Sequence, residues 1–179
     1  MFKIGEFSKL VRVSARMLRH YDKCGLLRPA EKEIPAINVL SLREVVGKFE
    51  DEPAQWDKMW AFIKQNGIDC KRTGYSVYHD DEYKDEDVDM EIAVPVSVLG
   101  ENKHDFVYKE LEAIPLAATI QFPGPYDNYN KAMEKLAVWI EQNGYEFAGL
   151  IRGHGIVMPG DGVAFEDSLT ELQVPVRKV

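Results

Sequence analysis

The sequence has little cysteine, with only Cys24 and Cys70 among its 179 residues. Two cysteines form neither a disulfide framework nor a paired metal-binding spacing, which disfavours a disulfide-stabilised secreted protein and a thiolate-based metal sensor. The chain also lacks a run of about 18 uninterrupted apolar residues, the length that a membrane-spanning helix needs. Its N-terminus lacks the apolar block of a signal peptide. We therefore expect a cytoplasmic protein with no membrane partner.

No set of residues indicates a catalytic centre, a metal or a cofactor. The histidines carry no motif, and no glycine-rich phosphate loop precedes a helix. The acidic run 80–91 alternates oxygen-bearing side chains like a calcium loop, but Lys84 stands at a ligand position and the middle lacks glycine. The sequence therefore predicts no metal and no cofactor, and it favours a binding protein over an enzyme.

The charge is divided unevenly along the chain. The net charge is −8, yet residues 1–30 contain seven basic and two acidic residues, or +5. The remaining residues contain 15 basic and 28 acidic ones, or −13. This asymmetry indicates a basic, nucleic-acid-facing head on an acidic body.

The basic head is predicted to form two short helices. Ile4, Phe7, Leu10 and Val11 share one helical face. Ser14 is a good N-cap for a second helix that runs from about 15 to 23, and a glycine follows it. Two short helices joined by a tight turn are typical of a helix-turn-helix unit, whose second helix enters the major groove of DNA.

The stretch IGEFSKLVRVSARMLRHYDKCGLLRPA resembles the opening of MerR-family transcription regulators. The resemblance implies that residues on or beside the second helix contact DNA, namely Ser14, Arg16, Arg19, His20 and Tyr21. After Ala30 the sequence departs from the family, because no wing, further helices or long dimerising helix follow. No heptad seam is visible, so the sequence predicts no coiled-coil dimer and leaves the question of a homodimer open. The partial head, residues 1–30, is either functional in DNA binding or vestigial.

A repeat of 80 residues organises the body. Ile34-Pro35 is repeated at 114–115, and the segment MEIAVPV around Glu91 is repeated as TELQVPV around Glu171. Helical periodicity covers 54–67 and 128–144, and each segment ends in Asn-Gly. Strands are predicted before these helices, at 37–46 and 116–122, and after them, at 73–79 and 149–157. The pattern predicts an α+β fold of tandem β-α-β-β units, with halves of about 31–100 and 101–179.

The body resembles a GyrI-like, or AraC-type, effector-binding domain over residues 31–179. The resemblance rests on VLSLREVV, DVDMEIAVPV, FPGPYDNYNKAMEKLAVWIEQNGYE and TELQVPV. It implies the sensor part of a transcription regulator. Some such domains stand alone as binders of drug-like molecules, and a subset is thought to hydrolyse them.

Alternation along TELQVPV directs Leu172 and Val174 to one face and Glu171 to the other. We expect the first face to pack on the helices and Glu171 to face a groove between the halves. A carboxylate among apolar groups needs a partner, so the groove should prefer a lipophilic cation. The resemblance also places Glu171 at the family's ligand-facing glutamate. Trp56 and Trp60 are expected in the core. The further pocket candidates are Glu91 and the aromatic residues Tyr75, Tyr108, Phe122, Tyr126, Trp139 and Phe165.

Two functions remain open. The first is an effector-responsive transcription regulator that binds a small lipophilic, cationic, drug-like molecule in its body and DNA at its head. The second is a GyrI-like binding protein, or a slow hydrolase, with a vestigial DNA-binding head. In the hydrolase, Glu171 would be a general base whose pKa is raised by burial.

Overall fold

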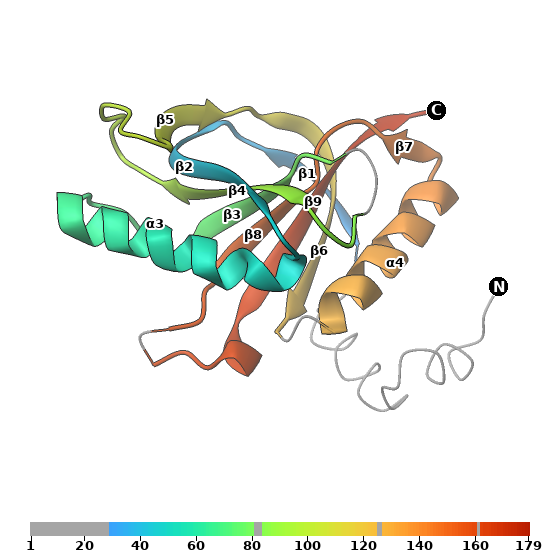
Figure 1. Cartoon of the computed structure of the whole chain (residues 1–179). Coiled ribbons are helices and arrows are strands. Elements are labelled where there is room, and N and C mark those ends of the chain that lie inside the picture. The colour runs from blue at the N-terminus through green and yellow to red at the C-terminus, as the bar shows by residue number, and fades with distance from the viewer. Residues whose placement is uncertain (1–28, 81–83, 125–126, 161) are drawn as a thin grey trace.

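A computed structural model describes residues 29–80, 84–124, 127–160 and 162–179 (Figure 1). Within these residues nine strands form one antiparallel sheet in the order β1-β6-β9-β8-β3-β4-β2-β5, with β7 paired to β9. The strands are β1 (Ala30–Ile34), β2 (Ile37–Val46), β3 (Gly74–Tyr78), β4 (Val88–Pro95), β5 (Phe106–Leu111), β6 (Ile114–Pro123), β7 (Tyr145–Phe147), β8 (Arg152–Val157) and β9 (Leu169–Lys178). The helices are α3 (Glu52–Asn66) and α4 (Asp127–Gln142), with short 3-10 turns η1 (Phe49–Asp51) and η2 (Phe165–Asp167).

The predicted α+β fold is confirmed as an antiparallel sheet with two helices. The order β6-β9-β8 in one half of the sheet mirrors β2-β4-β3 in the other, with β8 and β3 meeting at the centre. The strands β1, β5 and β7 were not predicted. The first two extend the sheet at its edges, where β1 pairs with β6 and β5 pairs with β2.

The predicted helix stops are confirmed. Gly67 ends α3 with a φ of 61°, and its N–H bonds back to the carbonyls of residues 63 and 64. Gly144 follows α4 with a φ of 70°. Both angles are in the left-handed region, which glycine adopts without the steric cost that a Cβ brings.

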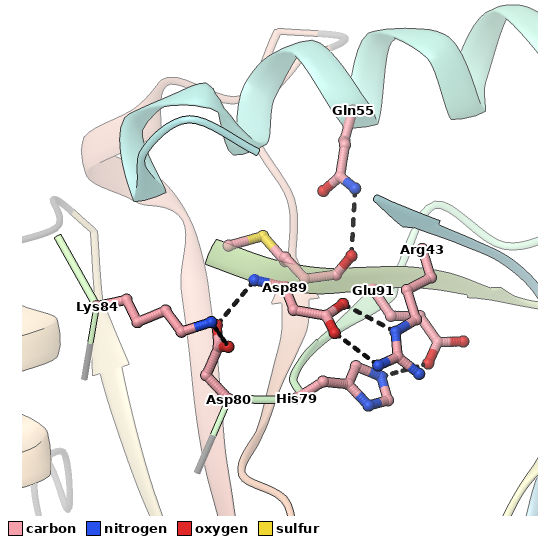
Figure 2. A network of polar contacts seen from close by, with 8 residues as sticks. Arg43, Gln55, His79, Asp80, Lys84, Asp89 and Glu91 are labelled. Atoms are coloured by element: carbon pink, nitrogen blue, oxygen red, sulfur yellow. Dashed lines mark hydrogen bonds and ion pairs between the residues drawn. The ribbon is translucent and has the colours of Figure 1, made fainter. Parts of the chain in front are cut away.

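Each helix packs its apolar stripe on its own half of the sheet. Met59 and Ile63 of α3 lie against a cluster that includes Leu40 and Ile92. On the other half, α4 packs against the β9 face of Leu172, Val174 and Val176, as predicted; its own buried contributions are Ala132, Leu136 and Ile140. Figure 2 shows Gln55 of α3 donating from Nε2 to the carbonyl of Met90 on β4, at 3.3 Å. The two helices thus lie on the same face of the sheet, α3 over β2 and β4 and α4 over β6 and β9, with the central strands β3 and β8 between them.

The predicted helix-turn-helix, with Ser14, Arg16, Arg19, His20 and Tyr21, lies outside the described residues. In the part of the chain that the structure describes, no helix is long and apolar enough to cross a membrane.

Candidate functional site

A cavity of about 430 Å³ lies between α3 and α4, above the central strands β3 and β8. Its floor contains Gly74 and Ser76 from β3 and Gly153 and Gly155 from β8. Because three of these four residues have no side chain, the sheet leaves space here that the helices do not fill. Cavities of roughly 300 to 1,000 Å³ are typical of small-molecule sites.

Six aromatic side chains contribute to the wall. They come from both halves of the domain: Trp56, Trp60, Tyr78, Phe122, Tyr129 and Phe165. The two tryptophan rings of α3 stack with centroids 5.8 Å apart, and Tyr129 meets Tyr78 and Phe122 edge-on at 6.2 and 6.1 Å. Such faces attract apolar and cationic groups. The prediction that Trp56 and Trp60 are core residues was wrong in part: both pack against the core of α3, but they also line the cavity.

Glu52 is an acidic group in this wall, and it is 7% exposed. Its Oε1 accepts a hydrogen bond from Trp56 Nε1 at 2.9 Å and one from Ser76 Oγ at 2.5 Å. The residue stands in the first turn of α3, where the positive end of the helix dipole stabilises a negative charge. The pKa of Tyr129 is raised to about 12, chiefly because the hydroxyl is buried and secondly because the charge of Glu52 lies nearby. The cavity therefore combines aromatic faces with a fixed carboxylate.

Of the predicted aromatic ligand residues, Phe122 and Phe165 line the cavity. Tyr75 instead stacks on His154, with ring centroids 4.5 Å apart. Trp139 instead stacks on Tyr145, with centroids 5.9 Å apart, at the margin of the α4 core. Tyr108 packs against the core of α3. Tyr126 lies outside the described residues.

Glu171 lies on the opposite face of the sheet from α4, as its alternation with Leu172 predicted, but it is already paired. Its side chain is buried and accepts bonds from Lys32 Nζ at 2.9 Å, Gln121 Nε2 at 3.0 Å and Gln173 Nε2 at 2.9 Å. Burial by itself raises the pKa of Glu171, but these donors outweigh burial and hold the pKa below its ordinary value. The raised pKa expected of a general base at Glu171 is therefore wrong. Ligand binding by Glu171 stays a prediction.

Glu91 is in a corresponding position on β4, and it is 1% exposed. His79 Nε2 lies 2.8 Å from one carboxylate oxygen, as Figure 2 shows, and Lys109 Nζ lies 2.5 Å from the other. Burial again raises the pKa of Glu91, and the hydrogen bonds from Lys109 and His79 overcome it, so that the pKa is lowered. Ligand binding by Glu91 likewise stays a prediction.

These two carboxylates should make the fold sensitive to acid. A group whose pKa is lower in the folded state contributes stability above its unfolded pKa, here about 4.5, and that contribution is lost as pH falls through the folded value. Each unit of lowering is equivalent to about 1.4 kcal/mol. We expect the free energy of unfolding, measured by urea denaturation, to fall between pH 5.5 and 3. The fall should be shallower in Glu91→Gln and Glu171→Gln, and equal slopes in all three proteins would contradict the assignment.

No group of three histidine, cysteine or acidic side chains among the described residues is arranged to hold a metal ion. What the described site offers a ligand is thus a partly open cavity with aromatic walls, one buried carboxylate from Glu52 and one exposed carboxylate from Asp57.

Several solved structures share this fold. The crystal structure of the EcmrR C-terminal domain is 30% identical, with a TM-score of 0.75, and the match covers 85% of this chain and 98% of that one. An EcmrR–DNA complex determined by cryo-electron microscopy is 28% identical, with a TM-score of 0.75; the match covers 96% of this chain and 66% of that one. A hydrolase from Listeria innocua shares the fold at 11% identity and a TM-score of 0.60, covering 89% of this chain and 98% of that one.

No curated protein matches the sequence. Two family models do match. Residues 3–33 match the MerR family regulatory protein, and residues 28–177 match the GyrI-like small molecule binding domain. The second match covers most of the chain and coincides with the sheet, the two helices and the cavity. The chain therefore belongs to the GyrI-like small-molecule-binding family and carries a MerR-type segment at its N-terminus.

Proposed function

We propose that this chain is an effector-responsive transcription regulator. Its GyrI-like domain binds a small, lipophilic, cationic, drug-like molecule, and its N-terminal segment contacts DNA through Ser14, Arg16, Arg19, His20 and Tyr21. The match of residues 3–33 to MerR regulators and the likeness to a DNA-bound EcmrR chain support the DNA-binding part. A regulator of this kind acts in the cytoplasm, where the DNA is.

The observation that carries the ligand part is the cavity between α3 and α4. Its aromatic wall offers faces to an apolar cation, and Glu52 offers an anionic partner at low dielectric, where an ion pair is stronger than in water. A neutral ligand of the same shape would gain the aromatic contacts but would leave the carboxylate without a new partner. Charge should therefore separate good ligands from poor ones.

The DNA part requires two copies of the head. Helix-turn-helix proteins read paired half-sites as dimers, and a single short basic helix would bind weakly and in a salt-dependent way. We propose that the regulator acts as a homodimer on DNA. Sedimentation velocity of the full chain, with and without DNA, measures this.

The central test uses the full chain and two probes of similar shape. Quenching of Trp56 and Trp60 fluorescence should report binding of tetraphenylphosphonium, and the neutral analogue triphenylphosphine oxide should bind at least about tenfold more weakly, a difference of about 1.4 kcal/mol. A gel-shift titration on fragments from upstream of the chain's own gene, repeated at several salt concentrations with and without the cation, measures DNA binding. Absence of any shift at low salt would refute the regulator, and equal binding of both probes would refute the cation preference.

A further inference from the structure

The strand β1 overlaps the end of the MerR-type match, which runs to residue 33, and so joins the N-terminal segment to the body. It is an edge strand of five residues, and four of them are exposed. Its pairing with β6 is interrupted by a register shift between Lys32 and Ile34. A short, exposed edge strand with an irregular register is at the low-stability end of a fold, because few contacts oppose its release. Release of β1 from β6 is therefore expected to cost less free energy than release of a central strand.

Two side chains fasten β1 to the body. Lys32 Nζ lies 2.9 and 3.2 Å from the two carboxylate oxygens of Glu171 on β9. The hydroxyl of Tyr145 donates to the carboxylate of Glu31. The first contact is the stronger anchor, because a buried carboxylate loses more when its charged partner leaves than an exposed one does. Glu171 thus holds the strand that connects the N-terminal segment to the body.

The partners of Lys32 lie directly behind the wall of the cavity. Phe122 of β6 pairs with Thr170 of β9, and both residues line the cavity. The next pair along the same two strands is Gln121 with Glu171, and it faces the other side of the sheet. Gln121 donates to Glu171 at 3.0 Å. A ligand that packs on Phe122 and Thr170 therefore orders the backbone that positions the acceptor of Lys32.

The other half of the domain contains a corresponding lysine–glutamate ion pair, on an edge strand that is not connected to the N-terminal segment. Lys109 reaches from the edge strand β5 to the buried Glu91 on β4, as Lys32 reaches from β1 to Glu171 on β9. The exposed fractions of the two lysine side chains are similar, at 49% and 38%. β5 does not follow the MerR-type segment. The Lys109–Glu91 pair is therefore a matched internal control.

We propose that β1 transmits ligand binding from the cavity to the N-terminal segment, with the Lys32–Glu171 ion pair as the link. Ligand binding orders the β6–β9 pair, favours the docked arrangement of β1 and so restrains the segment that precedes it. This inference rests on the proposed function. It assigns Glu171 a positioning role behind the cavity rather than contact with the ligand.

The test measures hydrogen exchange of the β1 amides in the full chain, with and without saturating tetraphenylphosphonium. In the wild-type chain we expect the cation to slow exchange over residues 31–34 about threefold or more, equivalent to about 0.65 kcal/mol. Lys32→Met should remove this slowing, and tryptophan quenching should show an affinity for the cation lowered by no more than the factor by which the cation slows exchange in the wild-type chain, because coupling is reciprocal. Lys109→Met should keep both the slowing of exchange over β1 and the wild-type affinity for the cation. Lys32→Arg, which retains the charge, should restore the slowing.

The outcomes separate the inference from the proposed function. If the wild-type chain does not quench with the cation, the ligand part of the proposed function fails, and the inference fails with it. If the wild-type chain binds but Lys32→Met slows exchange as the wild type does, only the inference fails. If Lys32→Met loses more affinity for the cation than this reciprocal coupling allows, the Lys32–Glu171 pair belongs to the ligand site and the transmission role is refuted.

Discussion

Replacing Glu52 with glutamine is expected to weaken binding of tetraphenylphosphonium by roughly 10- to 100-fold, equivalent to about 1.4 to 2.7 kcal/mol. The substitution keeps the shape of the side chain and an acceptor oxygen for Trp56 and Ser76. It removes the negative charge that a bound cation would neutralise. Isothermal titration or tryptophan quenching gives the two dissociation constants, and near-ultraviolet circular dichroism confirms that the aromatic packing is retained.

Asp57 provides the matched control. It also lines the cavity, but it is exposed, so water screens its charge. Asp57→Asn should change the affinity by less than about threefold, in keeping with the small effect of exposed charges. The neutral analogue triphenylphosphine oxide should bind the wild-type chain and Glu52→Gln equally. Equal affinity of both chains for the cation would place the anionic partner elsewhere, and a large loss in Glu171→Gln would identify it as the residue that the sequence had suggested.

The repeat and the alternation of side chains predicted most of the fold. The two copies of the PV-ending segment form β4 and β9, the strands on either side of the central pair β8 and β3. Leu172 faces a helix, as its alternation with Glu171 requires. The edge strands were missed for a physical reason. The segment AEKEI of β1 is mostly charged and exposed, so it carries no apolar alternation from which a strand could be recognised.

The site was harder to predict than the fold. Alternation tells which residues share a face of the sheet, but it does not tell which face keeps an open volume. That volume depends on how far apart α3 and α4 lie and on the glycines between them, and neither follows from the repeat. Glu52 was missed because the predicted helix began at residue 54, whereas α3 begins at Glu52, so the residue lay outside every predicted element. A usable signal was present in the spacing of Glu52 and Trp56, which lie one helical turn apart and bond to each other.

Glu171 shows why a buried carboxylate cannot be assigned to a ligand by its burial. The sequence argument required a cationic partner, and the fold supplies one in Lys32, 139 residues away in the chain. No local pattern connects these two residues, because β1 and β9 are brought together only through their common neighbour β6. The same holds for Lys109 and Glu91 in the other half.

Filling the floor of the cavity should weaken ligand binding without unfolding the protein. Gly153 of β8 is buried in this floor, and a Cβ added there would meet nothing nearer than 3.9 Å, at Ser76 O and Thr170 Cγ2. The backbone therefore accepts a side chain, and that side chain would occupy the volume the ligand needs. We expect Gly153→Leu to weaken binding of tetraphenylphosphonium by roughly 10- to 100-fold, in line with about 1 to 3 kcal/mol for overpacking.

The same substitution should leave stability unchanged or raise it by about 0.5 to 1 kcal/mol, because glycine is unfavourable inside a strand. A graded series separates filling from disruption: Gly153→Ala should cost little affinity, Gly153→Val more and Gly153→Leu most, while the urea midpoint stays constant or rises. Gly74→Ala is the contrasting case, since its Cβ would lie 2.3 Å from the Trp56 ring and must move that wall. It should lower stability and affinity together. If Gly153→Leu keeps both its stability and its affinity, the ligand does not enter this cavity, and the opposite face of the sheet around Glu171 becomes the site to test.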